Sequence, residues 1–146
     1  MNNQMTLRFL AIAENEAFAR MVISAFLVQT NPMLSVISEV RTAVSEAVTN
    51  AVVHAYHVQD TGWVEMRATL KEEEILIEIE DAGCGIDDVA QAMTPFYTSQ
   101  PDQERTGMGF SLMLSFMDRV SVESRPGSGT LVRMSKMLRS EDIDVL

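Results

Sequence analysis

Polar side chains interrupt the apolar pattern of one predicted helix at a spacing that places them on a single face. In "SEAVTNAVVHAY", residues 45–56, a carboxylate, an amide and an imidazole recur at every fourth position, at Glu46, Asn50 and His54. Residues four apart are neighbours on a helix surface. The opposite stripe is aliphatic, so this face is either the solvated side of the helix or the lining of a pocket. For His54 a structural role is the simpler interpretation.

A further carboxylate stands at the end of a predicted strand. Isoleucines alternate along residues 75–79, and Asp81 has the same parity, so its side chain should project toward the side on which the isoleucines pack. A carboxylate there needs a hydrogen-bond donor, because burying it unpaired is costly. Gly83 and Gly85 follow and allow a sharp turn and the close approach of a ligand. The alternative is an ordinary strand exit.

Glycines also stand where a later helix should begin. Gly107 and Gly109 in "ERTGMGFSLM" would expose backbone N–H groups at the helix start, which is a favourable position for an anion. Arg105, just upstream, could reach a terminal phosphate. The segment has neither a Rossmann glycine pattern nor the lysine of a P-loop, and a flexible hinge is the alternative. Thr130 begins a strand after "GSG", where a β-branched residue is also common.

The elements that would hold these residues alternate between strand and helix periodicity. Apolar residues at every second position predict strands, and apolar residues three and four apart predict helices. The predicted order is a strand at 5–12, helices at 13–31 and 34–52, strands at 63–70 and 73–81, a helix at 108–117, and a hairpin of 118–125 with 130–138. Runs of adjacent strands favour an α+β domain in which a mainly antiparallel sheet carries its helices on one face.

The helices should bury defined stripes. In the first, the stripe contains Phe18, Val22, Ala25 and Phe26, and in the second it runs from Leu34 to Val52.

Residues 1–138 are expected to form one domain, in which the long aperiodic segment 83–107 is a lid or a binding loop. The acidic residues 139–146 should form a mobile tail.

The composition limits the classes of function. The chain has 146 residues and a formal net charge of -10, which opposes non-specific nucleic-acid binding and favours a basic protein partner. Cys84 is the only cysteine, so no internal disulfide is possible. With no signal peptide and no apolar stretch approaching about 20 residues, a cytoplasmic protein that does not enter a membrane is expected.

Taken together, these segments resemble the motifs of the GHKL (Bergerat-fold) ATPases over residues 39–135. The N box of that family is similar to Glu46-x-x-x-Asn50, the first glycine box to Asp81-x-Gly83-x-Gly85, and the second to Gly107-x-Gly109, with Thr130 as the closing threonine. The resemblance implies a two-layer α/β sandwich with a mainly antiparallel, mixed sheet that binds ATP and Mg²⁺ between the sheet and its helices.

The same resemblance implies roles for individual residues. Asp81 would accept a hydrogen bond from the adenine amino group, Asn50 would bind Mg²⁺, and Glu46 would act as general base. Arg105 would neutralise charge on the transferred phosphoryl group. The segment 83–107 would be the ATP lid. The remaining phosphate contacts would come from the lid and the following helix, at Thr98, Ser99, Gly107, Met108 and Gly109.

Within that family, the segments "SEAVTNAVVHAY" and "PFYTSQPDQERTGMGFSLM" and the overall length resemble the small anti-sigma serine kinases of spore-forming bacteria. This implies a homodimer that holds a sporulation sigma factor when ATP is bound and phosphorylates a serine of an anti-anti-sigma protein. Arg20 is a candidate partner contact, although a solvated side chain is the simpler interpretation. The main rival is a nucleotide-gated binding module without kinase activity. A histidine-phosphorylating sensor kinase ranks last, since no room remains for a histidine-bearing hairpin.

Overall fold

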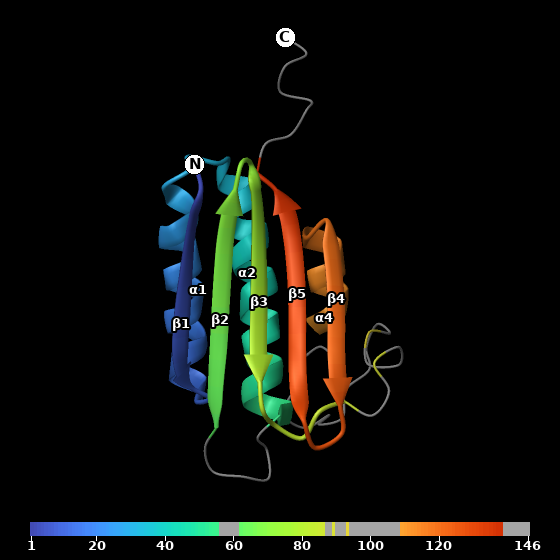
Figure 1. The fold of residues 1–146 in the computed structure, drawn as a ribbon. Helices are drawn as coiled ribbons and strands as arrows, with labels where there is room; N and C mark the ends of the chain where they lie inside the picture. The colour runs from blue at the N-terminus through green and yellow to red at the C-terminus, as the bar shows by residue number, and fades with distance from the viewer. Residues whose placement is uncertain (56–61, 87–88, 90–92, 94–108, 139–146) are drawn as a thin grey trace.

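A five-stranded antiparallel sheet forms one layer of the chain in the computed structural model (Figure 1), which describes residues 1–55, 62–86, 89, 93 and 109–138. The strand order is β1-β2-β3-β5-β4, and all four neighbouring pairs are antiparallel. This confirms the mainly antiparallel sheet expected from the sequence. The strands are β1 (Asn3–Leu10), β2 (Trp63–Lys71), β3 (Glu74–Asp81), β4 (Arg119–Arg125) and β5 (Gly129–Met137).

The helices form the second layer. They are α1 (Ala13–Val28), α2 (Leu34–Asn50) with a short π-helix η1 (Ala51–Ala55) continuing it, and α4 (Gly109–Phe116). All of them lie on the same side of the sheet in Figure 1, so the other side of the sheet is left uncovered by the described residues. The expected two-layer α/β sandwich with its helices on one face is therefore confirmed.

The core lies between the two layers. Along β3 the alternating isoleucines 75, 77 and 79 are all buried, and the matching positions of β2 are buried as well. The intervening residues carry charge on the uncovered face. There, Arg67 and Arg133 both pair with Glu78, at 3.5 and 2.8 Å. Alternation of this kind fixes the register, because a slip of one residue would turn the isoleucines to solvent.

The predicted face of α1 is wrong by about one residue. The helix buries Ala19, Ile23, Phe26 and Leu27, whereas Phe18 remains 49% exposed and Ala25 is exposed as well. The segment "AFARMVISAFLV" has apolar residues on almost every side, so the 3.6-residue period alone leaves the direction of the face open. Packing against α2 and the sheet decides it.

The second helix differs from its prediction at both ends. Leu34 is its first residue and is 83% exposed, so it does not belong to the buried stripe, which begins at Val40. At the other end, the α-helical hydrogen bonding stops at Asn50, and Ala51–Ala55 form a π-helical turn. Such turns are rare and often occur at functional sites.

Part of the prediction lies outside the described residues. This applies to most of the segment 83–107, to the tail 139–146, and to residues 56–61 between η1 and β2. In the described part of the chain, every helix is too short or too polar to span a membrane.

Candidate functional site

The residues singled out from the sequence converge at one end of the two layers. Helix α2 ends at Asn50, β3 ends at Asp81, and β5 begins beside Thr130, and these three ends lie together at the lower edge of the sheet in Figure 1. Asp81 and Thr130 are direct partners in the β3–β5 register, so their side chains lie on the same face. The end of α2 and the start of the segment that follows β3 therefore lie close together.

Asp81 has the environment that its strand parity predicts. Its side chain is partly buried, and its Oδ1 accepts a hydrogen bond from the backbone N–H of Gly83 at 2.9 Å. Burial raises the pKa of Asp81 to about 6, with Glu80 adding to the rise, while the N–H groups of Gly83 and Thr130 oppose it. The site therefore holds a carboxylate in a poorly solvated position, where a further hydrogen-bond donor would stabilise the ionised form.

Gly83 allows the loop after β3 to lie directly against the end of η1. A Cβ at Gly83 would lie 2.4 Å from the Ala55 carbonyl oxygen and 2.5 Å from the Ala55 Cβ, distances that no side chain tolerates. The neighbouring N–H of Cys84 donates to the same carbonyl at 2.9 Å. The π-helical turn thus ends in a carbonyl that fixes the glycine segment to α2.

The turn between β4 and β5 contacts residues 83–86 from the side opposite η1. Gly85 has φ 78°, and a Cβ there would lie 2.0 Å from the Arg125 carbonyl oxygen. The N–H of Gly127 donates to the Cys84 carbonyl at 2.6 Å. Residues 83–86 are therefore held between α2 and the hairpin, and Gly85 is required by both its backbone conformation and the close contact.

Glu46 and Asn50 are both partly buried on α2, about 6 Å apart along the helix axis. The Nδ2 of Asn50 is buried and has no hydrogen-bond partner among the described residues. Leaving a buried polar group unpaired costs about 1–3 kcal/mol, so such a group points to a missing ligand. The nitrogen and oxygen of an amide are assigned from their partners, so the open end of Asn50 can equally present its oxygen to a cation.

Ser124 is a polar residue that the sequence reasoning missed. It lies in β4 opposite Thr130, and its Oγ is 2.8 Å from the Thr130 Oγ1. The same Oγ accepts a hydrogen bond from the N–H of Ile86 at 2.7 Å. The available signal was the turn: once "PGS" closes the hairpin, counting back from Thr130 places Ser124 directly opposite it.

Arg20 is not brought into this cluster. Arg20 lies on α1, 3.8 Å from Glu16, and its side chain is 43% exposed. Glu16 in turn accepts a hydrogen bond from the Ser45 hydroxyl of α2. Gly109 is the first residue of α4. The side chain of His54 lies outside the described part of the structure, as do residues Thr98, Ser99, Arg105, Gly107 and Met108.

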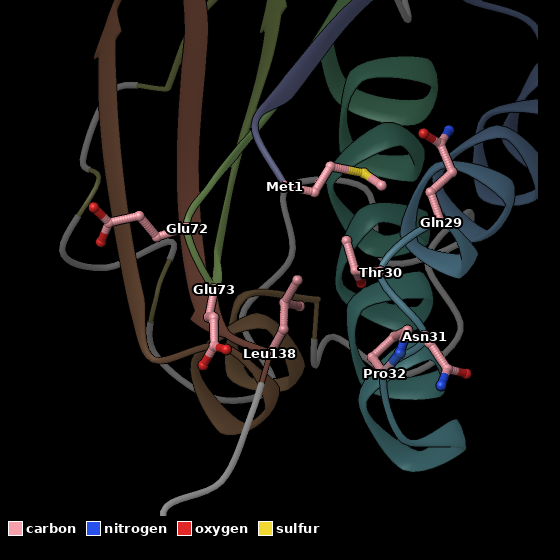
Figure 2. A pocket seen from close by; sticks show the side chains of 8 residues that line it. All are labelled: Met1, Gln29, Thr30, Asn31, Pro32, Glu72, Glu73 and Leu138. Carbon is pink, nitrogen blue, oxygen red and sulfur yellow. The ribbon is translucent and has the colours of Figure 1, made fainter.

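A cavity of about 200 Å³ lies at the opposite end of the molecule (Figure 2). It is formed by residues 29–32 between α1 and α2, by Glu72 and Glu73 in the β2–β3 turn, and by Met1 and Leu138. None of these belongs to the convergent site, and β3 runs the length of the sheet between the two. This cavity is therefore separate from the candidate site at Asp81.

Comparison with known proteins gives this site its class. Residues 9–136 match the family described as the histidine kinase-like ATPase domain, so the chain is an ATP-binding domain of that class. Among solved structures it is similar to the RsbU and RsbW domains of Rv1364c from Mycobacterium tuberculosis, with TM-score 0.70 and 18% identity over 94% of this chain and 33% of that one. The catalytic domain of histidine kinase ThkA is similar at TM-score 0.57 and 13% identity, over 92% of this chain and 96% of that one. Both likenesses concern the fold.

Sequence relatives define the family more narrowly. The chain is 49% identical to the anti-sigma F factor of Clostridium novyi over 94% of its own length and 96% of the relative's. It is 46% identical to the anti-sigma F factor of Oceanobacillus iheyensis, over 94% of each chain. The chain belongs to the anti-sigma F factor family.

Proposed function

We propose that the chain is an ATP-dependent protein serine kinase that also sequesters a sigma factor. The observation that carries the proposal is the convergence of Asp81 with the end of α2, where the amide of Asn50 has an open, buried end. Membership in the anti-sigma F factors and in the histidine kinase-like ATPases supports both halves of the function.

Asp81 and Asn50 would bind the two ends of the nucleotide. The Asp81 carboxylate lies where a donor is needed, and the amino group of adenine is such a donor. Asn50 fits Mg²⁺ because hard cations prefer oxygen ligands and accept few protein groups when phosphate oxygens and water complete their shell. When bound, Mg²⁺ would neutralise charge on the phosphates. Gly83, Gly85 and Thr130 would complete the base-binding wall.

Glu46 is proposed as the general base. Its carboxylate would take the proton from the serine hydroxyl of the substrate as the serine Oγ bonds to the γ-phosphorus of ATP and the bond to the leaving ADP oxygen breaks. Arg105 would offset charge on the transferred group. The proposed phosphate contacts are Thr98, Ser99, Gly107, Met108 and Gly109.

The proposed protein partners are a sporulation sigma factor and an anti-anti-sigma protein that carries the acceptor serine. The formal net charge of -10 favours basic partner surfaces, and a new phosphate, with a charge of about -2, would weaken docking of the phosphorylated product. Arg20 on α1 is a proposed partner contact. No direct nucleic-acid contact is proposed.

A homodimer is also proposed, with α1 as the contact surface and a second copy of the chain as its occupant. Phe18, Met21 and Val28 are 49%, 70% and 59% exposed, and with exposed Ala25 they follow a 3-4-3 spacing. That spacing forms a continuous seam along one helix, which a second α1 can cover in knobs-into-holes packing.

Incubation of the chain with labelled ATP, Mg²⁺ and the candidate anti-anti-sigma protein tests the proposed activity. Label is expected on one serine of the partner, and the sigma factor should bind with ATP present and dissociate when ATP is removed. A chain that binds ATP and the sigma factor but transfers no phosphate to any serine would instead be a nucleotide-gated binding module.

A further inference from the structure

Side chains from three adjacent strands form a row beside the proposed adenine site. Ser124 in β4 is paired with Thr130 in β5, and Thr130 is paired with Asp81 in β3. Directly paired residues share a face of the sheet, so the two hydroxyls and the carboxylate lie side by side. Thr130 is 9% exposed, and Ser124 is partly buried.

The hydrogen bonds of Ser124 determine which way its neighbour's proton points. The Ser124 Oγ lies 2.7 Å from the Ile86 N, 3.0 Å from the Gly129 carbonyl oxygen and 2.8 Å from the Thr130 Oγ1. A hydroxyl has one proton to donate and two lone pairs to accept with. The Ile86 N–H can only donate, and the Gly129 carbonyl can only accept. All three contacts are hydrogen bonds only if Ser124 donates to Gly129 and the Thr130 hydroxyl donates to Ser124.

We infer that Ser124 is a positioning residue that makes the Thr130 hydroxyl a hydrogen-bond acceptor toward the purine base. With its proton committed to Ser124, Thr130 presents lone pairs beside the Asp81 carboxylate. A 6-amino purine offers two N–H donors to this pair of acceptors, whereas a 6-oxo purine offers a carbonyl oxygen that meets acceptors only. Ser124 thus favours adenine over hypoxanthine without touching the base. This inference rests on the proposed function, since it requires the base to lie at Asp81.

Removal of the Ser124 hydroxyl should change base selectivity as well as affinity. In Ser124→Ala, the Thr130 proton is released and can rotate toward a 6-oxo group. ATP should then bind about 5-fold more weakly, the effect of about one hydrogen bond, while ITP should bind as well as before or better. The ratio of the ITP and ATP dissociation constants should fall about 5-fold or more. A loosened fold would weaken both nucleotides equally and leave that ratio unchanged.

The experiment measures Kd for ATP and ITP by calorimetry with the full chain and Mg²⁺. Ser124→Thr keeps the hydroxyl and should keep the ratio. Ser121→Ala is the matched control, because Ser121 lies in the same strand, is exposed and is paired with Arg133. If Ser124→Ala does not fold, Ser124→Cys keeps a side chain of similar shape whose sulfur accepts the Thr130 proton much more weakly, and its ratio should fall as well.

Each outcome separates the inference from the function on which it rests. If wild-type chain binds neither nucleotide, the proposed function fails, and the inference fails with it. If wild type prefers ATP and the variants at Ser124 keep the same preference, the proposed function stands and only the inference is overturned. A double-variant cycle with Thr130→Val gives a further test, because Ser124→Ala should have no additional effect on the ratio once the Thr130 hydroxyl is gone.

Discussion

Asp81 and Thr130 face each other across β3 and β5, and the backbone N–H of Thr130 donates to the Asp81 carboxylate. The last residue of β3 is thereby joined to the second residue of β5, near the end of α2. This pairing is the fixed part of the site, since both residues belong to the sheet. The residues proposed to contact phosphate come later in the sequence, between β3 and the start of α4.

Protonation of Asp81 should control both stability and nucleotide binding. Burial raises its pKa from 3.8 to about 6 in the folded chain, so between these values the folded state binds more protons than the unfolded state. The free energy of unfolding therefore falls as pH rises from about 4 to about 6, by at most about 3 kcal/mol. Asp81→Asn should remove this slope, so that denaturant titrations show the variant equal to wild type near pH 4 and more stable at pH 7.

ATP affinity should follow the same ionisation in the opposite sense. Because the ionised carboxylate is the proposed acceptor for the adenine amino group, affinity should decrease as pH is lowered through about 6. Asp81→Asn should bind ATP at least about 10-fold more weakly at pH 7.5 and retain only the pH dependence of the phosphates themselves. Equal pH profiles for wild type and variant would contradict the role of Asp81.

Gly83→Ala should damage the site through a backbone clash. The new Cβ would lie 2.4 Å from the Ala55 carbonyl oxygen, so the loop or η1 must move. The free energy of unfolding should fall by about 1–3 kcal/mol. ATP should bind more weakly as well. Gly127→Ala is the matched control, since its Cβ would meet no atom within 4 Å. At φ 78° it should cost only about 1 kcal/mol and leave ATP binding intact. Thermal denaturation and calorimetry distinguish the two.

Lys136 should contribute more stability than Arg133, the other charged residue of β5. Its Nζ donates to the Phe116 carbonyl at the end of α4 at 2.7 Å and pairs with Glu39 of α2 at 3.0 Å, and its side chain is 13% exposed. Lys136→Met should lower the unfolding free energy by about 1.5–3 kcal/mol. Arg133→Met, at a side chain 43% exposed on the uncovered face, should have a smaller effect, because solvent screens exposed ion pairs. Equal losses in urea titrations would contradict this difference.

The proposed dimer surface can be tested by placing a charge in the seam of α1. Met21 is 70% exposed, so Met21→Glu should leave the folded protomer intact and shift the chain to a monomer in analytical ultracentrifugation. Met137→Glu, at an apolar residue 49% exposed on β5, is the control and should remain dimeric. A dimer that persists in Met21→Glu would exclude α1 as the contact surface.

Local periodicity predicted the parts of this site that one element fixes by itself. The direction of Asp81 follows from strand alternation, and the common face of Glu46 and Asn50 follows from the helical step. The face of α1 did not follow, because Phe18 and Ile23 are equally apolar and only packing distinguishes them. Contacts between elements could not be predicted from the sequence. The approach of Gly83 to Ala55, for example, depends on how the layers dock and on a π-helical turn that has no sequence signature.

In the proposed mechanism, Glu46 activates a serine hydroxyl beside a nucleotide held by Asp81 and Asn50. Single-turnover phosphoryl transfer to the anti-anti-sigma protein by Glu46→Gln tests it most directly, with ATP affinity measured on the same preparation and Glu74→Gln, at the far end of β3, as control. Glu46→Gln is expected to bind ATP within about 3-fold of wild type and to transfer phosphate at least about 100-fold more slowly. Transfer at the wild-type rate by Glu46→Gln would contradict it.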